Sequence, residues 1–163
     1  MARDFNQHQQ KSEFEEKVLD MRRVTRVVAG GKRFRFRATV VLGNGSGKVG
    51  IGVGKGLDVQ QAIAKAKAKA GREMVQINLF EKRTIAHETE AKYSAAKVLL
   101  KPAPVGHGLR AGSAIRSVLA LAGIKDATAK ALGRTTNKLT NAWATMEALK
   151  AIKSVKPKQV DAA

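Results

Sequence analysis

Residues 33–42, RFRFRATVVL, begin with an alternation between basic and apolar side chains. Every second position from 34 to 42 is apolar, and the positions between them begin with Arg33, Arg35 and Arg37. Successive side chains of a β-strand point to opposite faces of its sheet, so this period of two predicts a strand. One face of that strand belongs to a core, and the other face carries positive charge.

Glycines punctuate this strand on both sides. Gly30 and Gly31 precede it and predict a tight hairpin with residues 18–28, which are rich in β-branched side chains. A Gly-Asn-Gly turn at 43–45 follows it, and residues 48–55, KVGIGVGK, alternate again. In this second strand one phase of the alternation is glycine, at Gly50, Gly52 and Gly54, so one of its faces has no side chains.

A strand face without side chains allows another backbone to approach closely. One interpretation is that the backbone of a binding partner lies there, between the flanking cations Lys48 and Lys55. The other is that the glycines accommodate tight packing by the helix that follows in the sequence. The sequence leaves both interpretations open, and both can hold at different glycines.

The glycine spacing also imitates nucleotide-binding loops. Gly45, Gly47 and Gly50 satisfy the dinucleotide pattern G-x-G-x-x-G, but a strand follows them where that pattern needs a helix N-terminus for the pyrophosphate. No Walker A, HRD, DFG or H-E-x-x-H sequence occurs, and the three histidines are scattered. No catalytic residue, metal or cofactor is therefore predicted. A nucleotide-dependent enzyme that uses the glycine hairpin is kept as the alternative.

The chain as a whole divides into two small units of mixed structure. In the first, Asp58 and Gln61 form a capping-box-like start to a helix with an apolar stripe. In the second, strands are expected over residues 83–90 and 96–101 and helices over 113–122 and 140–152, while 127–133 fit either. The predicted class is α+β. The predicted boundaries are a mobile tail at 1–11, domains at 12–79 and 80–153, and a polar tail at 154–163.

Charge is the strongest global signal. The chain has 31 lysines and arginines against 13 acids, a net charge of +18. Such a chain repels itself unless a polyanion neutralises it, and nucleic acid is the expected polyanion; the alternative is a solvated basic face. The excess is concentrated between Asp20 and Asp58, where no acid occurs. The basic residues of this segment are Arg22, Arg23, Arg26, Lys32, Arg33, Arg35, Arg37, Lys48 and Lys55.

Two further classes are excluded or disfavoured by what the sequence lacks. It has no cysteine, which excludes disulfide scaffolds and thiolate metal sites. No apolar run reaches membrane-spanning length, and no polybasic segment flanks an apolar anchor, so a membrane is not an expected partner.

The glycine stretch and its surroundings resemble a known family. From Gly31, the residues GKRFRFRATVVLGNGSGKVGIGVGK match every specified position in the signature of the bacterial small-subunit ribosomal protein numbered five. That signature runs from a glycine and a basic residue, through an aromatic, a small residue and an aliphatic pair, to a glycine-rich strand that ends in a basic residue. The segments VQQAIAKAKAKA and KPAPVGHGLRAGSAIR are similar to the same family. The resemblance covers roughly residues 12–153.

The chain departs from the family pattern at three places in the second unit. His107 stands where the family usually has Thr, Ser113 stands where Gly is common, and Lys138 stands in the Asn-Pro motif before the last helix.

The resemblance implies a first domain like a double-stranded-RNA-binding domain and a second with the βαβ-type fold of this ribosomal protein. It implies a structural protein, not an enzyme, in the cytoplasmic small ribosomal subunit, near the junction of head and body. There the family binds small-subunit rRNA and contacts ribosomal proteins four and eight. It contributes to decoding accuracy and to the channel by which mRNA enters. A double-stranded-RNA binder outside the ribosome is a second alternative.

The charge pattern and the resemblance together predict the contact residues. Val24, Thr25 and Arg26 would belong to the loop at the spectinomycin site. The expected rRNA contacts are Arg22, Arg23, Arg26, Gly30, Gly31, Lys32, Arg33, Arg35, Arg37, Lys48, Gly50, Gly52, Gly54, Lys55, Lys65 and Lys69. The residues expected to face ribosomal protein four are Gly106, His107, Gly108, Arg110, Gly112 and Arg116.

Overall fold

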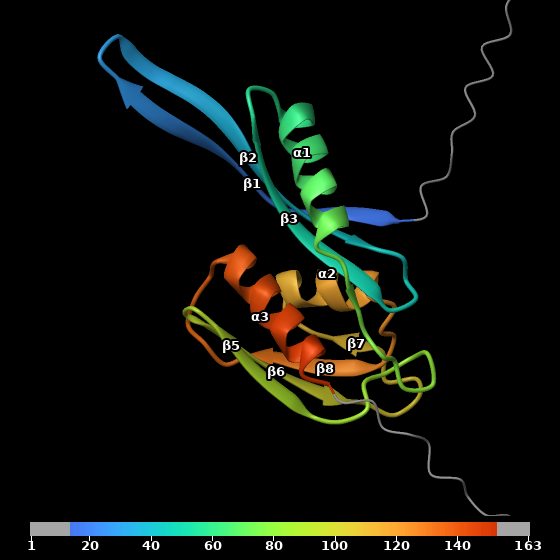
Figure 1. The fold of residues 1–163 in the computed structure, drawn as a ribbon. Coiled ribbons are helices and arrows are strands. Elements are labelled where there is room, and N and C mark those ends of the chain that lie inside the picture. The colour runs from blue at the N-terminus through green and yellow to red at the C-terminus, as the bar shows by residue number, and fades with distance from the viewer. Residues whose placement is uncertain (1–13, 153–163) are drawn as a thin grey trace, which may run out of the picture.

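The computed structural model describes residues 14–152, which form two four-stranded sheets with helices packed on them (Figure 1). The predicted α+β class is confirmed, whereas the predicted tails at 1–11 and 154–163 lie outside the described residues. The elements in chain order are β1 (Glu15–Val28), β2 (Gly31–Gly43), β3 (Lys48–Gly56), α1 (Val59–Arg72), β4 (Val75–Gln76), β5 (Thr89–Tyr93), β6 (Ala96–Pro102), β7 (Leu109–Arg110), α2 (Ser113–Leu121), β8 (Ala127–Ala131) and α3 (Lys138–Lys150).

The first sheet is an antiparallel meander in the order β1-β2-β3-β4. Ala38, Val40 and Leu42 of β2, which belong to the predicted apolar phase, are buried on one face of this sheet. The amphipathic helix α1 covers that face. Its three buried alanines, which complete this cluster, are Ala62, Ala66 and Ala70.

The glycine face of β3 is the surface on which α1 rests. A Cβ atom added to Gly50, Gly52 or Gly54 would overlap carbonyl oxygens of the α1 backbone. All three glycines are buried under the helix. The prediction that they contact rRNA is therefore wrong, because the helix that follows in the sequence already occupies the space that RNA would need. The same packing leaves no room for a nucleotide on this face.

The other face of the first sheet packs on the second unit. Val41, Val49 and Ile51 are fully buried there, in the same hydrophobic cluster as Ile115 and Leu119 of α2. The sheet therefore lies between α1 on one side and the helices α2 and α3 on the other (Figure 1). The two units share one core across this interface.

The turn between β2 and β3 also binds the second unit. The backbone N–H groups of Gly45 and Gly47 donate to the carbonyl oxygens of Leu121 and Ala122, at 3.0 and 2.9 Å. These carbonyls lie at the C-terminal end of α2, where a helix runs out of donors of its own. Gly123 adopts a φ of 87° beside them, and a Cβ on it would overlap the backbone of Gly45. Gly45 and Gly47 of the turn therefore bring the backbones of the two units into direct hydrogen-bonding contact.

The second sheet has the order β5-β6-β8-β7, with β7 parallel to β8 and joined to it through α2. The helix predicted at 113–122 is confirmed as α2, the helix predicted at 140–152 begins slightly earlier as α3, and the ambiguous segment 127–133 contains β8. The strand predicted at 83–90 is wrong for most of its length. Residues 80–84 form turns instead, in which Glu81 and Lys82 have φ values of 51° and 54°.

Candidate nucleic-acid interface

The outer halves of β1 and β2 form a two-stranded ribbon that extends beyond the rest of the sheet (Figure 1). Toward the tip of the hairpin, the pairing of β2 with β3 ends at Phe36, which lies opposite Gly56. From there to the turn at Ala29 and Gly30, the two strands pair only with each other. An isolated hairpin is marginally stable in water, so this ribbon is suited to gain stability from a binding partner.

The strand register assigns each basic side chain to one face of the ribbon. Arg22 lies opposite Arg37, Arg26 opposite Arg33, and Lys55 of β3 opposite Arg37 on its other side. Two residues that pair directly across neighbouring strands lie on the same face of the sheet, and so do residues i and i+2 of one strand. One face of the ribbon and of the sheet at its root, which we call the arginine face, therefore holds Arg22, Arg26, Arg33, Arg35, Arg37 and Lys55.

The arginine face has almost no internal neutralisation. Arg22 pairs with Asp20, at 2.7 Å between Nε and Oδ2. Within residues 14–152, no other member of this face has an ion-pair partner. A shallow groove of about 320 Å³ runs along it, lined in part by Arg26, Arg33 and Lys55. Like charges placed side by side repel, so this face is suited to bind an anion.

The register divides the predicted rRNA-contact residues of β1 and β2 between the two faces. Arg23 pairs with Phe36 and lies on the opposite face, where its guanidinium sits 4.6 Å from the ring centroid of Phe34. Lys32 lies on that same opposite face, paired with Val27. Arg23 and Lys32 are therefore separated from the arginine face by the thickness of the ribbon.

The remaining predicted contacts occupy different places. Gly30 and Gly31 form the exposed tip, where an added Cβ would meet nothing, and Gly31 has a φ of 123°. Lys48 lies about 23 Å from Lys55, seven residues away along β3. Lys65 and Lys69 are exposed on the outer side of α1. The structure thus does not gather these three lysines on the arginine face.

The predicted spectinomycin-site residues lie in a strand. Val24, Thr25 and Arg26 belong to β1, in the hairpin that β1 forms with β2, as the sequence predicted for residues 18–28. The side chains of Val24 and Arg26 point to the arginine face, and Thr25, opposite Phe34, points to the other.

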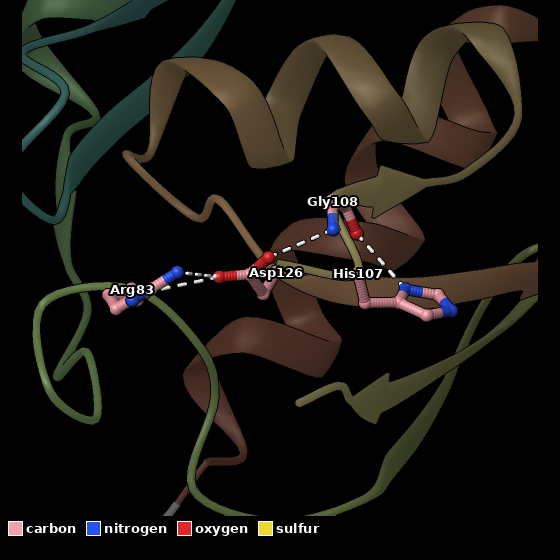
Figure 2. A network of polar contacts seen from close by, with 4 residues as sticks. All are labelled: Arg83, His107, Gly108 and Asp126. Carbon is pink, nitrogen blue, oxygen red and sulfur yellow. Dashed lines mark hydrogen bonds and ion pairs between the residues drawn. The ribbon is translucent and has the colours of Figure 1, made fainter. Parts of the chain in front are cut away.

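The second predicted site, the segment from Gly106 to Arg116, is held by a carboxylate that the sequence did not indicate. Asp126 accepts hydrogen bonds from Nη2 and Nε of Arg83, at 2.7 and 3.1 Å, and from the backbone N–H of Gly108, at 2.9 Å (Figure 2). Asp126 is 3% exposed. The N–H of Gly108 and, after it, the Arg83 guanidinium hold the pKa of this carboxyl below its ordinary value of 3.8.

This network fixes a loop that needs glycine. Gly106 and Gly108 have φ values of 84° and 74°, which other residues rarely adopt. His107 lies between them, half-buried, with Nδ1 at 3.2 Å from the carbonyl oxygen of Gly108 (Figure 2). Gly112 is the N-cap of α2, and Arg110 and Arg116 are exposed near it. Asp126 thus holds the loop at Gly108, and within residues 14–152 neither Arg110 nor Arg116 has an ion-pair partner.

Neither a metal site nor a membrane span is found in the described part of the chain. Residues 14–152 contain no group of three His, Asp or Glu side chains that could hold a metal ion. No helix in this range is long and apolar enough to cross a membrane.

The chain matches two protein-family profiles. Residues 14–78 match the N-terminal domain of ribosomal protein S5, and residues 91–163 match its C-terminal domain. The small ribosomal subunit protein uS5 of Thermus thermophilus is 45% identical over 88% of this chain and 87% of its own length. The chain belongs to the ribosomal protein S5 family.

The two ribosomal protein S5 profiles together match both units, and the signature around the glycine turn lies within the first match. The uS5 of Campylobacter jejuni is 46% identical over 88% of this chain and 96% of its own length. The uS5c of Spinacia oleracea is 46% identical over 86% of this chain, which spans 45% of that longer protein. The chain is accordingly a structural constituent of the small ribosomal subunit and not an enzyme.

Proposed function

We propose that the arginine face binds the phosphate backbone of small-subunit rRNA. The observation that carries this proposal is six cations on one face of the protruding ribbon and of the sheet at its root, with Asp20 as their one ion-pair partner within residues 14–152. Side chains cannot read the deep major groove of duplex RNA, so proteins recognise it through phosphates, 2′-hydroxyls and shape. The planar guanidinium with its five donors suits phosphate oxygens, which favours the arginine-rich composition of this face.

We further propose that the ribbon acts as a clamp in the cytoplasmic small subunit, near the junction of head and body. The glycine tip is thin enough to enter between RNA segments, and the root of the ribbon is buried between α1 and the second unit. A ribbon with such a root keeps its direction relative to the rest of the protein. Contacts along it would hold the head relative to the body and support decoding accuracy, with Val24, Thr25 and Arg26 near the spectinomycin site.

The second unit is proposed to supply the protein contacts. The loop from Gly106 to Gly112, locked by Asp126, would face ribosomal protein four, and Arg110 and Arg116 would lie at that contact. Ribosomal protein eight, and mRNA where it enters the subunit, are the further partners that the resemblance implies. A locked loop is suited to this role because it loses little conformational freedom on binding.

The proposal is tested by measuring the affinity of the full chain for its organism's small-subunit rRNA across a salt series. Log affinity should fall linearly with log salt, with about 0.7–0.9 of slope for each phosphate contact. The triple variant Arg26→Ala/Arg33→Ala/Arg35→Ala should lower this slope by about 2 to 3. The matched control is Lys92→Ala/Lys130→Ala/Arg134→Ala, which removes three exposed cations of the second unit.

Three results would contradict the proposal. If both triple variants lower the slope equally, the arginine face has no special part in binding. A wild-type affinity that does not depend on salt would exclude phosphate contacts altogether. Sedimentation of the cellular protein away from small subunits would favour a double-stranded-RNA binder outside the ribosome.

A further inference from the structure

The face of the ribbon opposite the arginine face carries exposed aromatic and apolar side chains. Phe34 and Phe36 both point to this face, two residues apart on β2. Phe36 packs against the core cluster under α1, whereas Phe34 lies beyond the helix and is 46% exposed. Val27, further toward the tip, is 72% exposed. Phe34 is therefore a large, partly exposed ring on the outer part of β2, beyond the residues of β2 that α1 covers.

Polar side chains surround Phe34 in a specific arrangement. Arg23 places its guanidinium 4.6 Å from the centroid of the ring, which is cation–π distance. Thr25 lies directly opposite Phe34 on β1, so its hydroxyl, which both donates and accepts hydrogen bonds, stands beside the ring. Lys32 is the next residue of β2 on this face. A flat ring and a flat cation thus lie next to a hydroxyl and an ammonium group.

We propose that Phe34 and Arg23 form a stacking platform for an unpaired base of the RNA. Unstacked bases in RNA loops and bulges stack on aromatic rings and on arginine guanidinium planes. Thr25 would bond the edge of the base, and Lys32 the adjacent phosphate. This proposal rests on the proposed function, because the phosphate contacts of the arginine face deliver the RNA to the ribbon.

A base fits this platform better than a protein surface does. Protein interfaces have an apolar core in which aromatic residues and arginine are enriched but lysine is depleted. Here Arg23 and Lys32 flank the ring, and Val27 is the nearest exposed apolar neighbour on the same face. The arginine face, on the other side of the ribbon and of the sheet at its root, carries five arginines and Lys55. Each feature complements a nucleotide, which offers a flat base and a negative phosphate.

The test uses three labelled RNA probes of about 12 nucleotides, within the usual site size of a single-strand binder. One is a single strand, one is the same strand with abasic sites at its central positions, and one is a perfect duplex. Their affinities for the full-length protein are measured by fluorescence anisotropy. The variants are Phe34→Leu, which keeps an apolar side chain without a ring, and Phe34→Tyr, which keeps the ring. Arg35→Ala on the arginine face is the comparison.

Phe34→Leu should weaken binding to the single strand by about 5-fold or more, as expected for the loss of one stacked base. It should leave the abasic strand and the duplex unchanged, and Phe34→Tyr should bind all three probes like the wild type. Arg35→Ala should weaken all three probes and reduce their salt dependence. Equal thermal unfolding midpoints for wild type, Phe34→Leu and Phe34→Tyr establish that the folds are intact.

The contrary outcomes separate the two proposals. If the wild type binds with the expected salt dependence but Phe34→Leu changes no probe, or changes all three equally, the stacking platform is excluded and phosphate binding stands. Unchanged RNA binding together with poor incorporation of Phe34→Leu into small subunits would assign Phe34 to a protein contact instead. If the wild type itself shows no salt-dependent binding, the proposed function fails.

Discussion

Gly52 of β3 lies directly beneath Ala66 of α1, so close that a Cβ on Gly52 would overlap the carbonyl oxygen of Ala66. Gly50 and Gly54 repeat this relationship one helical turn away on either side. Alternate residues of a strand and every fourth residue of a helix thus meet in register. The glycines of β3 set the distance at which α1 packs on the first sheet.

Replacing Gly52 with alanine should destabilise the fold by about 1–3 kcal/mol, the usual cost of overpacking a close contact. The measurement is the urea unfolding midpoint. Gly71→Ala is the matched control, because Gly71 lies in α1 with open space where a Cβ would stand. Alanine there should be neutral or raise stability by up to about 1 kcal/mol. Equal effects of the two substitutions would show that α1 does not rest on the glycine face.

Gly123→Ala should cost more than Gly106→Ala. Both glycines have positive φ values, 87° and 84°, at which alanine costs about 1–2 kcal/mol. At Gly106 the added methyl group meets open space, whereas at Gly123 it would overlap the backbone of Gly45 across the interface between the units. We expect the difference to be about 1–3 kcal/mol in the free energy of unfolding. A difference near zero would mean that the turn at 44–47 moves away at no cost.

The strands around the glycine turn could be predicted from the sequence because one face of the sheet is buried, which keeps every second residue of these strands apolar or small. Ala38, Val40 and Leu42 are buried by α1, which keeps their phase apolar. Residues 83–88 have no such cause: Ile85 is buried as a single anchor within a segment that otherwise turns, and one buried residue has no period.

The candidate site was predictable only in part. The parity of Arg33, Arg35 and Arg37 placed them on one face from the sequence alone, and the same parity separates Arg23 from Arg22. The burial of the glycine face depended on where α1 packs, which alternation does not specify. The pair of Arg83 and Asp126 lies 43 residues apart, and no local pattern joins them.

Ile51→Ala in β3 should lower the stability of the second unit. Ile51 is fully buried in the cluster that also contains α2 and α3, so its truncation should cost about 2–5 kcal/mol. The chain has one tryptophan, Trp143, which lies in α3. Its fluorescence therefore reports the second unit, while far-ultraviolet circular dichroism reports both. If the two units fold as one, both signals should shift together in urea. A Trp143 transition that stays at the wild-type midpoint would show independent units.

Asp126 should make the stability of the chain depend on acid pH. Its pKa is lowered in the folded state by the N–H of Gly108 and by Arg83, so the folded state binds the proton later than the unfolded state does as pH falls. The stabilisation is therefore present above about pH 4, the ordinary range of the carboxyl, and is lost as pH falls through the lower pKa of the folded state. Asp126→Asn should remove this part of the pH dependence in thermal unfolding between pH 6 and pH 3.

Glu88→Gln is the control, because Glu88 pairs with Lys101 at an exposed position and its loss should leave the profile near that of the wild type. A profile for Asp126→Asn that runs parallel to the wild type throughout this range would show that the carboxyl does not stabilise the loop at Gly108 as an ion.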